Sequence, residues 1–221
     1  MLQLCRSKYE WIDKFTIYGE RHSGTNFLED CIKKQFGLNI TYFYGFKHWL
    51  GFAKPERIAY DRHILYLGIV RNPYNWLTAF FNAPYHVPIH SRLSLESFLT
   101  NEWYSIDHNG KEIMGDRNYT TQPNLQRYKN IFELRKQKCI YLSQDMPVLA
   151  SNYVLLSYDS FLKNHKTYLN IIGRRFDLKN IGSPPDLIEK RSIEMEPHIK
   201  DLIDTNLDWS VEESLGYYKR T

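Results

Sequence analysis

The residues best suited to bind an anion lie in the segment GERHSGTN, residues 19–26. Its two glycines enclose four residues, which is the spacing of the first six positions of a phosphate-binding loop. The β-rich run 15–18 precedes the segment, and apolar residues at helical spacing follow from Phe27 to Phe36. In a strand–loop–helix unit of this kind, loop amides and the helix N-terminus point at one spot and attract an anion. The segment therefore predicts a phosphate site.

The end of this loop departs from the pattern of a magnesium–triphosphate site. Thr25 stands where a phosphate-binding Lys is expected, and Asn26 stands where a Mg²⁺-binding Ser or Thr is expected. We expect Arg21 and His22 to supply positive charge instead. The alternative is an ordinary strand-to-helix turn whose glycines serve only its geometry. The candidate anion-binding residues of the loop are Gly19, Arg21, His22, Ser23, Gly24, Thr25 and Asn26.

Two further groups of basic residues follow apolar runs that predict strands. Lys47 and His48 come after the run 40–44, and Arg71 comes directly after the run 64–70. Ligands of parallel α/β sheets bind outside the carboxyl ends of the strands, so we expect these residues to converge with the loop. A His is the natural base for a hydroxyl group, which predicts that His48 is the catalytic base. Lys47 is expected to act beside it by supplying a positive charge. The alternatives are an inert His at a strand end and a solvated Lys.

Composition bounds the kind of protein. The 221 residues suit one domain, and 43% apolar with 24% charged residues is ordinary for a soluble globular chain. A net charge of +4 without a long basic run suits an anionic ligand but does not predict nucleic-acid binding. The three cysteines lie far apart, and neither a signal peptide nor a membrane span is evident. We therefore expect a cytoplasmic protein.

The elements that must position these residues alternate along the chain. Strands are predicted at 15–18, 40–44, 64–70 and 153–156. Helices are predicted at 27–36, 73–81, 94–103, 124–146, 162–172, 196–205 and 210–215. Such alternation predicts an α/β fold of three layers, with a mainly parallel sheet flanked by helices.

The segment at about 84–123 has poor periodicity and several prolines, which predicts an insertion or lid over the site within a single domain, 1–221. His86 and His90 have the spacing H-x-x-x-H, but Pro88 between them opposes the helix that would aim both at a metal. We therefore expect no metal here, and we expect Tyr85 and His86 to line a cleft for a second substrate.

These motifs resemble those of the sulfotransferases that use 3′-phosphoadenosine 5′-phosphosulfate (PAPS). Residues 22–25, HSGT, match a basic residue followed by Ser-Gly-Thr in the family's first loop. Residues 68–76, GIVRNPYNW, match its apolar strand followed by Arg-Asn-Pro and a helix. The segments 157–161 and 207–217 are similar to a late strand end and to the C-termini of the family. The resemblance covers most of the chain apart from about 84–123.

The resemblance implies a P-loop NTPase-like sulfotransferase fold that works without a metal, with PAPS as the sulfuryl donor. It implies that Arg71 grips the 3′-phosphate and that Lys190 and Arg191 close over it. The family often has a Ser at the position of Ala79, and the adjacent Thr78 is the candidate substitute. The implied function is transfer of a sulfuryl group to an acceptor hydroxyl of a carbohydrate or small molecule.

Two other classes of function remain open from the residues alone. A P-loop kinase for a nucleoside or small molecule would need the Lys and the Ser or Thr that are absent after Gly24. A non-catalytic module that binds an anion or a glycan would use the same basic edge without needing His48.

Overall fold

A computed structural model describes residues 2–6, 11–50, 55–186 and 195–220 of the chain. Its centre is a five-stranded sheet in the order β1-β5-β4-β2-β3. The strands are β1 (Leu2–Arg6), β2 (Lys14–Tyr18), β3 (Asn39–Ile40), β4 (Ile64–Val70) and β5 (Asn152–Ser157). Strands β2 to β5 run parallel, and β1 pairs antiparallel with β5 at one edge. The expected α/β class with a mainly parallel sheet is confirmed.

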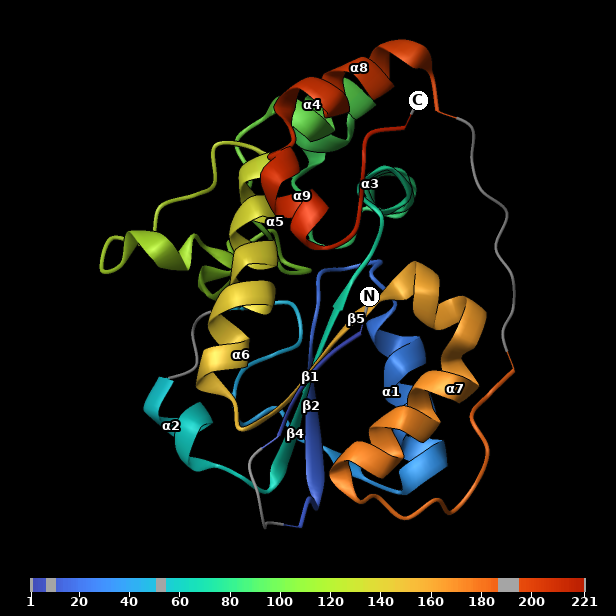
Figure 1. Cartoon of the computed structure of the whole chain (residues 1–221). Helices are drawn as coiled ribbons and strands as arrows, with labels where there is room; N and C mark the ends of the chain where they lie inside the picture. Colours follow the sequence, from blue (N-terminus) through green and yellow to red (C-terminus); the bar gives the residue numbers. More distant parts are fainter. Residues whose placement is uncertain (1, 7–10, 51–54, 187–194, 221) are drawn as a thin grey trace.

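Helices cover both faces of the sheet (Figure 1). One face carries α1 (Thr25–Phe36) and α7 (Tyr158–Phe176), and the other carries α2 (Pro55–Tyr60), α5 (Ile131–Ile140) and α6 (Met146–Leu149). Beyond the carboxyl ends of the strands lie α3 (Pro73–Asn82), α4 (Leu95–Thr100), α8 (Pro197–Asn206) and α9 (Trp209–Ser214). The π-helical turn Tyr141–Asp145 joins α5 to α6, and short 3₁₀ turns lie at Ile89–Arg92, Met114–Asp116 and Tyr119–Thr121.

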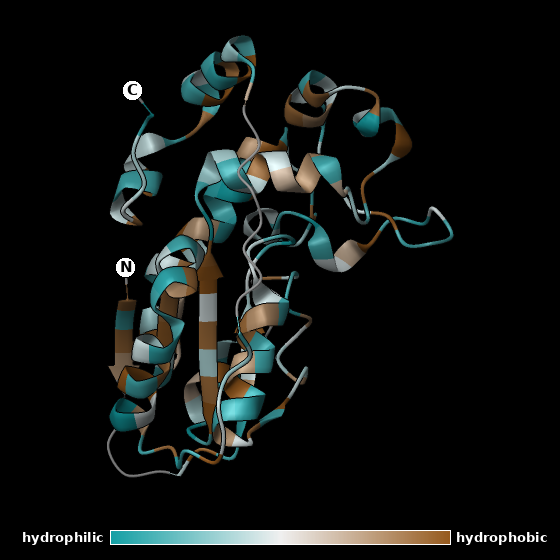
Figure 2. Cartoon of the chain, turned by 90° about the vertical axis from the view of Figure 1, so that its right-hand side faces the viewer, coloured by the Kyte–Doolittle hydropathy of each residue, from teal (hydrophilic) through white to brown (hydrophobic). Residues whose placement is uncertain are grey.

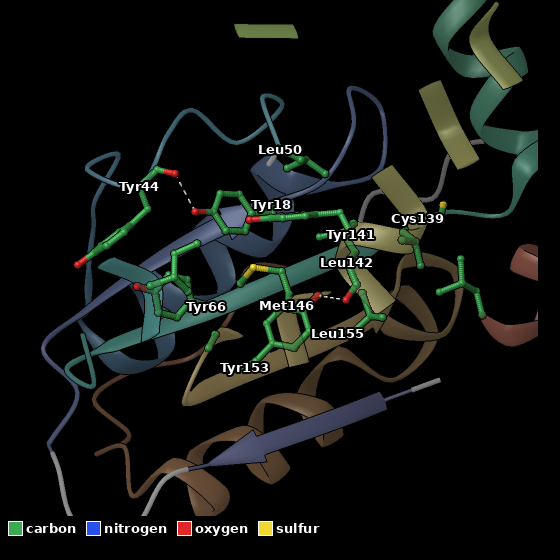
Figure 3. Close-up of a cluster of buried hydrophobic side chains, with 14 of the residues drawn as sticks. Tyr18, Tyr44, Leu50, Tyr66, Cys139, Tyr141, Leu142, Met146, Tyr153 and Leu155 are labelled. Carbon is green, nitrogen blue, oxygen red and sulfur yellow. Dashed lines mark hydrogen bonds between the residues drawn. The ribbon is translucent and has the colours of Figure 1, made fainter. Parts of the chain in front are cut away.

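The sheet is the core of the molecule because its central strands are buried on both faces. Every residue of β4 and β5 is buried, as the continuous apolar run in β4 predicts for a central parallel strand. Figure 2 shows the contrast in hydropathy, with mostly brown strands and helices that mix brown and teal. The face beneath α5 and α6 is rich in tyrosine, and buried tyrosine hydroxyls usually have a hydrogen-bond partner. Tyr18 donates to the Tyr44 carbonyl (2.8 Å) and Tyr153 to the Leu142 carbonyl (2.7 Å), as Figure 3 shows.

Local signals in the sequence place the helices around the loop and after β4. Helix α1 ends at Gly37, whose φ of 68° is the left-handed conformation that glycine tolerates. Helix α3 begins at Pro73, and the side chain of Asn72 accepts a hydrogen bond from the Asn75 amide. Both boundaries agree with the prediction, so the chain leaves the sheet after β2 and β4 as expected.

Two predicted elements are wrong in extent. The strand expected at 40–44 is only Asn39–Ile40, because the chain turns at residues 42–45 and the Tyr42 and Phe43 rings are exposed. The helix expected from residue 124 begins at Ile131, because Tyr128 instead pairs with Trp103 in a β-bridge. It then continues through the π-helical turn to Leu149. Strand β1 and helix α2 were not predicted.

The segment 84–123 packs against the rest of the molecule through an apolar cluster that lies beyond the edge of the sheet. This cluster joins α3, α4, α5 and α8 around buried rings that include Trp76, Phe80, Phe98 and Trp103. The segment 84–123 therefore shares a core with α3, α5 and α8 beyond the edge of the sheet. Within the described ranges, no helix is long and apolar enough to cross a membrane.

Candidate anion-binding site

The loop between β2 and α1 requires both of its glycines. A Cβ on Gly19 would lie 2.7 Å from the Ile69 carbonyl oxygen, because the loop leaves the sheet pressed against β4. Gly24 has a φ of +93°, and a Cβ there would lie 2.1 Å from the Tyr158 ring. The spacing of glycines seen in the sequence therefore reflects one close approach and one left-handed backbone position.

The loop turns its carbonyl groups toward the protein. The carbonyls of residues 20–22 accept hydrogen bonds, in turn, from Ser23 Oγ (2.5 Å), Trp76 Nε1 (2.8 Å) and Arg71 (2.9 Å). The first backbone bond of α1 is donated by Leu28, so the amides that precede it have no partner within the helix. With its acceptors used internally, the end of the loop presents amide donors, which is the polarity that an anion needs.

The end of this loop, Gly24 to Asn26, lines an open cleft of about 630 Å³ at the carboxyl edge of the sheet. The predicted site residues that line it are Arg21, His22, Gly24, Thr25, Asn26, Lys47, His48 and Arg71. Other residues that line it include Tyr85 and His86 of the segment 84–123, Tyr158 of α7, and the carboxylates Asp30 and Asp186. The loop, the segment after β3 and the end of β4 thus converge as the topology predicts. Gly19 and Ser23 lie behind the cleft and shape the loop.

Arg71 is held where β4 ends. One of its terminal nitrogens donates to the His22 carbonyl, and the guanidinium lies over the Tyr158 ring, 5.0 Å from the centroid. Stacking leaves the edge of a guanidinium available for further hydrogen bonds. Arg71 is therefore a fixed positive group on one wall of the cleft.

Lys47 brings a positive charge to the end of the loop. Its Nζ bonds Asn26 Oδ1 (2.5 Å) and lies 3.6 Å from a carboxylate oxygen of Glu29. An ammonium group consequently occupies the first turn of α1, beside the position where the loop lacks a Lys and a Mg²⁺-binding hydroxyl. The backbone supports this placement, since the Gly19 amide donates to the Lys47 carbonyl (2.9 Å).

His48 is oriented by the loop itself. Its Nδ1 lies 2.7 Å from the Gly19 carbonyl oxygen, so a neutral ring donates from Nδ1 and keeps its lone pair on Nε2. Burial lowers the pKa of His48 to about 4, and the nearby Arg21 and Lys138 act in the same direction. Hydrogen bonding to Gly19 and the charge of Glu20 oppose this shift without reversing it. The ring is therefore neutral at physiological pH and can accept a proton at Nε2.

Arg21 does not direct its guanidinium into the cleft. The group is buried and bonds Ser105 Oγ (2.9 Å) and Asp116 Oδ2 (2.7 Å), with Glu20 Oε1 2.9 Å from its Nε. Lys138 pairs with the same two carboxylates, 2.5 Å from each. We refer to Glu20, Arg21, Ser105, Asp116 and Lys138 as the buried ion cluster.

His22 also does not supply a positive charge to the cleft. Its ring stacks on Tyr85, and Nε2 lies 2.7 Å from the Ala83 carbonyl oxygen. Burial lowers the pKa of His22, and the neighbouring Arg71 and Arg21 lower it further. The residue that brings a positive charge to the end of the loop is therefore Lys47, rather than Arg21 or His22 as expected.

Other predicted residues lie elsewhere. Thr78 donates to the Tyr74 carbonyl (2.9 Å) and lines a separate hollow between α3, α4 and α8. Lys190 and Arg191 lie outside the described residues. His86, by contrast, lines the cleft as expected, and its Nδ1 lies 2.9 Å from the Ile106 carbonyl oxygen. Among the residues placed by the structure, no three His, Cys, Asp or Glu side chains are grouped to hold a metal ion.

Sequence reasoning missed the buried ion cluster. Arg21 and Asp116 are 95 residues apart, and Glu20 and Lys138 are 118 residues apart. No spacing rule links residues at such separations, so only the fold brings them together. Lys138 lies among the mixed polar and apolar residues of α5, and its local sequence carries no signal of its partners.

Comparisons of the chain with family models, curated proteins and solved structures gave no match.

Proposed function

We propose that the protein is a PAPS-dependent sulfotransferase. The observation that carries the proposal is the pairing of Lys47 with Asn26 at the end of a loop that lines the cleft. An ammonium group there suits a phosphate that needs no bridging Mg²⁺, as in the leaving group of PAPS. The sequence resemblance to sulfotransferases supports the same donor.

The chemistry assigned to this site is an in-line displacement at sulfur. The acceptor oxygen forms a bond to sulfur while the bond from sulfur to the 5′-phosphate oxygen breaks, and the acceptor proton moves to His48 Nε2. Loop amides and Lys47 stabilise the charge that grows on the departing phosphate, and Arg71 binds the 3′-phosphate. The products are the sulfated acceptor and adenosine 3′,5′-bisphosphate. The acceptor class that we propose is a hydroxyl of a carbohydrate or small molecule, bound near Tyr85 and His86.

The first test is a thermal-shift comparison of adenosine 3′,5′-bisphosphate with AMP, ADP and ATP. A ligand that binds only the native state raises Tm by mass action. We expect the bisphosphate to stabilise the protein most, with or without EDTA. Equal stabilisation by AMP would remove the 3′-phosphate assignment of Arg71, and a dependence on Mg²⁺ would favour a kinase.

The second candidate is a non-catalytic module that binds a phosphate- or sulfate-bearing ligand. The low pKa of His48 favours it, because a base with a pKa of about 4 is weak at neutral pH. The test is transfer of radiolabelled sulfate from PAPS to a panel of glycans and phenols. A protein that binds adenosine 3′,5′-bisphosphate but shows no transfer would be a non-catalytic module.

A further inference from the structure

Lys138 lies outside the cleft but contacts the segment that carries the base. The α5 residue is buried, and its Nζ makes three bonds: to Glu20 Oε2 (2.5 Å), Asp116 Oδ1 (2.5 Å) and the His48 carbonyl (2.7 Å). An ammonium group has three N–H donors, so every donor is used. The three acceptors belong to the loop after β2, the insertion and the segment after β3.

The partners of Lys138 are themselves fixed. Asp116 Oδ2 accepts from Arg21 and from Ser105 (2.5 Å), while Glu20 Oε1 accepts from the Arg21 amide (2.7 Å). The cluster contains two cationic and two anionic side chains, so its charges balance. A balanced, hydrogen-bonded cluster in a dry interior allows few other arrangements. It therefore fixes the position of the His48 backbone relative to the loop.

The ring of His48 is fixed from its other side. Nδ1 bonds the Gly19 carbonyl, one residue before Glu20 of the cluster. The same Gly19 donates its amide to the Lys47 carbonyl. Any movement of the His48 backbone away from Lys138 would break the alignment of Nδ1 with Gly19 and so turn Nε2 out of the cleft.

From these contacts we propose that Lys138 is the positioning residue for His48, and that the buried ion cluster couples the insertion to the base. The inference deepens the proposed function, since it assigns a support to the same site. The charged groups that face His48 are Glu20 and Arg21 from the loop and Lys138 from α5. Removing Lys138 takes away one of the two cations that pair with Glu20, the other being Arg21. It also removes a positive charge that lowers the pKa of His48, and both changes favour the protonated ring.

The test is an NMR titration of ¹⁵N-histidine-labelled protein between pH 3.5 and 8. In the wild type His48 should titrate with a midpoint near 4 and stay neutral above pH 5, with its proton on Nδ1. In Lys138→Met the midpoint of His48 should rise by at least one pH unit and the Nδ1–H tautomer should lose its dominance. Lys136→Met is the matched control, because Lys136 lies on the same helix and pairs with Asp208 at the surface. It should leave the His48 signals unchanged.

Lys138→Arg keeps the charge of the cluster. It tests whether Lys138 positions His48 if Lys138→Met does not fold. A planar guanidinium cannot reproduce three diverging donors, so we expect an upward shift of at least half a unit. Wild-type His48 signals in a folded Lys138 variant would overturn the proposal. Under the proposed function, Lys138→Arg should also lower kcat about tenfold with KM for PAPS unchanged. A titration shift in a protein that fails to bind adenosine 3′,5′-bisphosphate would refute the function alone, whereas bisphosphate binding without the shift would refute the positioning role alone.

Discussion

At the scale of single residues, His48 is the group on which the proposed chemistry depends. His48→Ala should lower turnover by about two to four decades and leave the affinity for adenosine 3′,5′-bisphosphate nearly unchanged. The wild-type rate should rise with pH through an apparent pKa near 4, rather than near the ordinary 6.5, because burial disfavours the charged ring. Initial rates between pH 4 and 8 measure the limb, which the variant should lack. Near-wild-type turnover in His48→Ala would rule out His48 as the base.

Gly24 allows a direct test of the loop conformation. Gly24→Ala places a side chain at a φ of +93° and drives its Cβ into the Tyr158 ring. The two effects together should cost at least about 3 kcal/mol of unfolding free energy in urea denaturation.

Gly110→Ala is the matched control for Gly24. Gly110 also has a positive φ, +78°, but nothing lies within 4 Å of the added Cβ. It should cost about 1–2 kcal/mol from backbone strain alone. Equal losses in the two variants would contradict the close approach of Gly24 to α7.

At the scale of elements, α5 is tied to the C-terminal helices by a buried ion pair. Arg135 bonds both oxygens of Glu212 in α9, at 2.5 and 2.7 Å, and also bonds the Arg71 carbonyl (2.9 Å). Glu212→Gln leaves Arg135 without a charged partner in the interior. We expect a loss of about 3–5 kcal/mol in unfolding free energy.

The surface pair of Lys136 and Asp208 joins the same two parts of the chain and serves for comparison. Lys136→Met should cost less than about 1 kcal/mol, because solvent screens exposed pairs. If Glu212→Gln lowered the unfolding free energy no more than Lys136→Met does, the buried pair would not hold α9 against α5.

The sequence predicts best where one local rule acts alone. The apolar run of β4, the glycine stop after α1 and the Asn72–Pro73 start of α3 each carry their own signal, and all three agree with the structure. Strand 40–44 was overestimated because β propensity does not reveal that Tyr42 and Phe43 face solvent. Strand β1 was missed because its five residues gain stability only from pairing with β5, far along the chain.

The residues that line the site were predictable from the sequence, but the hydrogen bonds and ion pairs between them were not. Topology alone placed Lys47, His48 and Arg71 beside the loop. The roles assigned to Arg21 and Lys47 required knowledge of the carboxylates nearby. Asp116 pairs with Arg21 in the interior, and Glu29, together with the Asn26 side-chain amide, holds Lys47 at the loop.

At the scale of the whole molecule, buried neutral histidines make stability depend on pH. The pKa of His48 is about 4 in the folded state, below its ordinary value of 6.5. Above pH 6.5 the ring is neutral in both states and its full contribution is present. As pH falls toward 4 the unfolded chain takes the proton first, so the unfolding free energy should fall by about 3 kcal/mol. His22, whose pKa is also lowered, adds to the loss in the same direction.

Urea unfolding at pH 7.0 and pH 4.5 measures this loss. His48→Gln removes one titrating group and should flatten the dependence, whereas His90→Gln, at an exposed position, should keep it. An unfolding free energy that is constant across this range in the wild type would show that His48 is solvated in the folded state.

The pairing of β1 with β5 has a consequence for how the chain is made. Residues Leu2–Arg6 find their partners only at Asn152–Ser157, about 150 residues later. At a synthesis rate of about 5–20 residues per second, the first strand waits roughly 8–30 s on the ribosome before its partner has been added. In the folded protein Leu2 and Leu4 pack against the apolar cluster between the sheet and helices α1 and α7. During that interval they are exposed next to unpaired backbone groups. The edge strand can therefore join the sheet only after β5 has been made, so both outer positions on this side of β4 are filled late in synthesis.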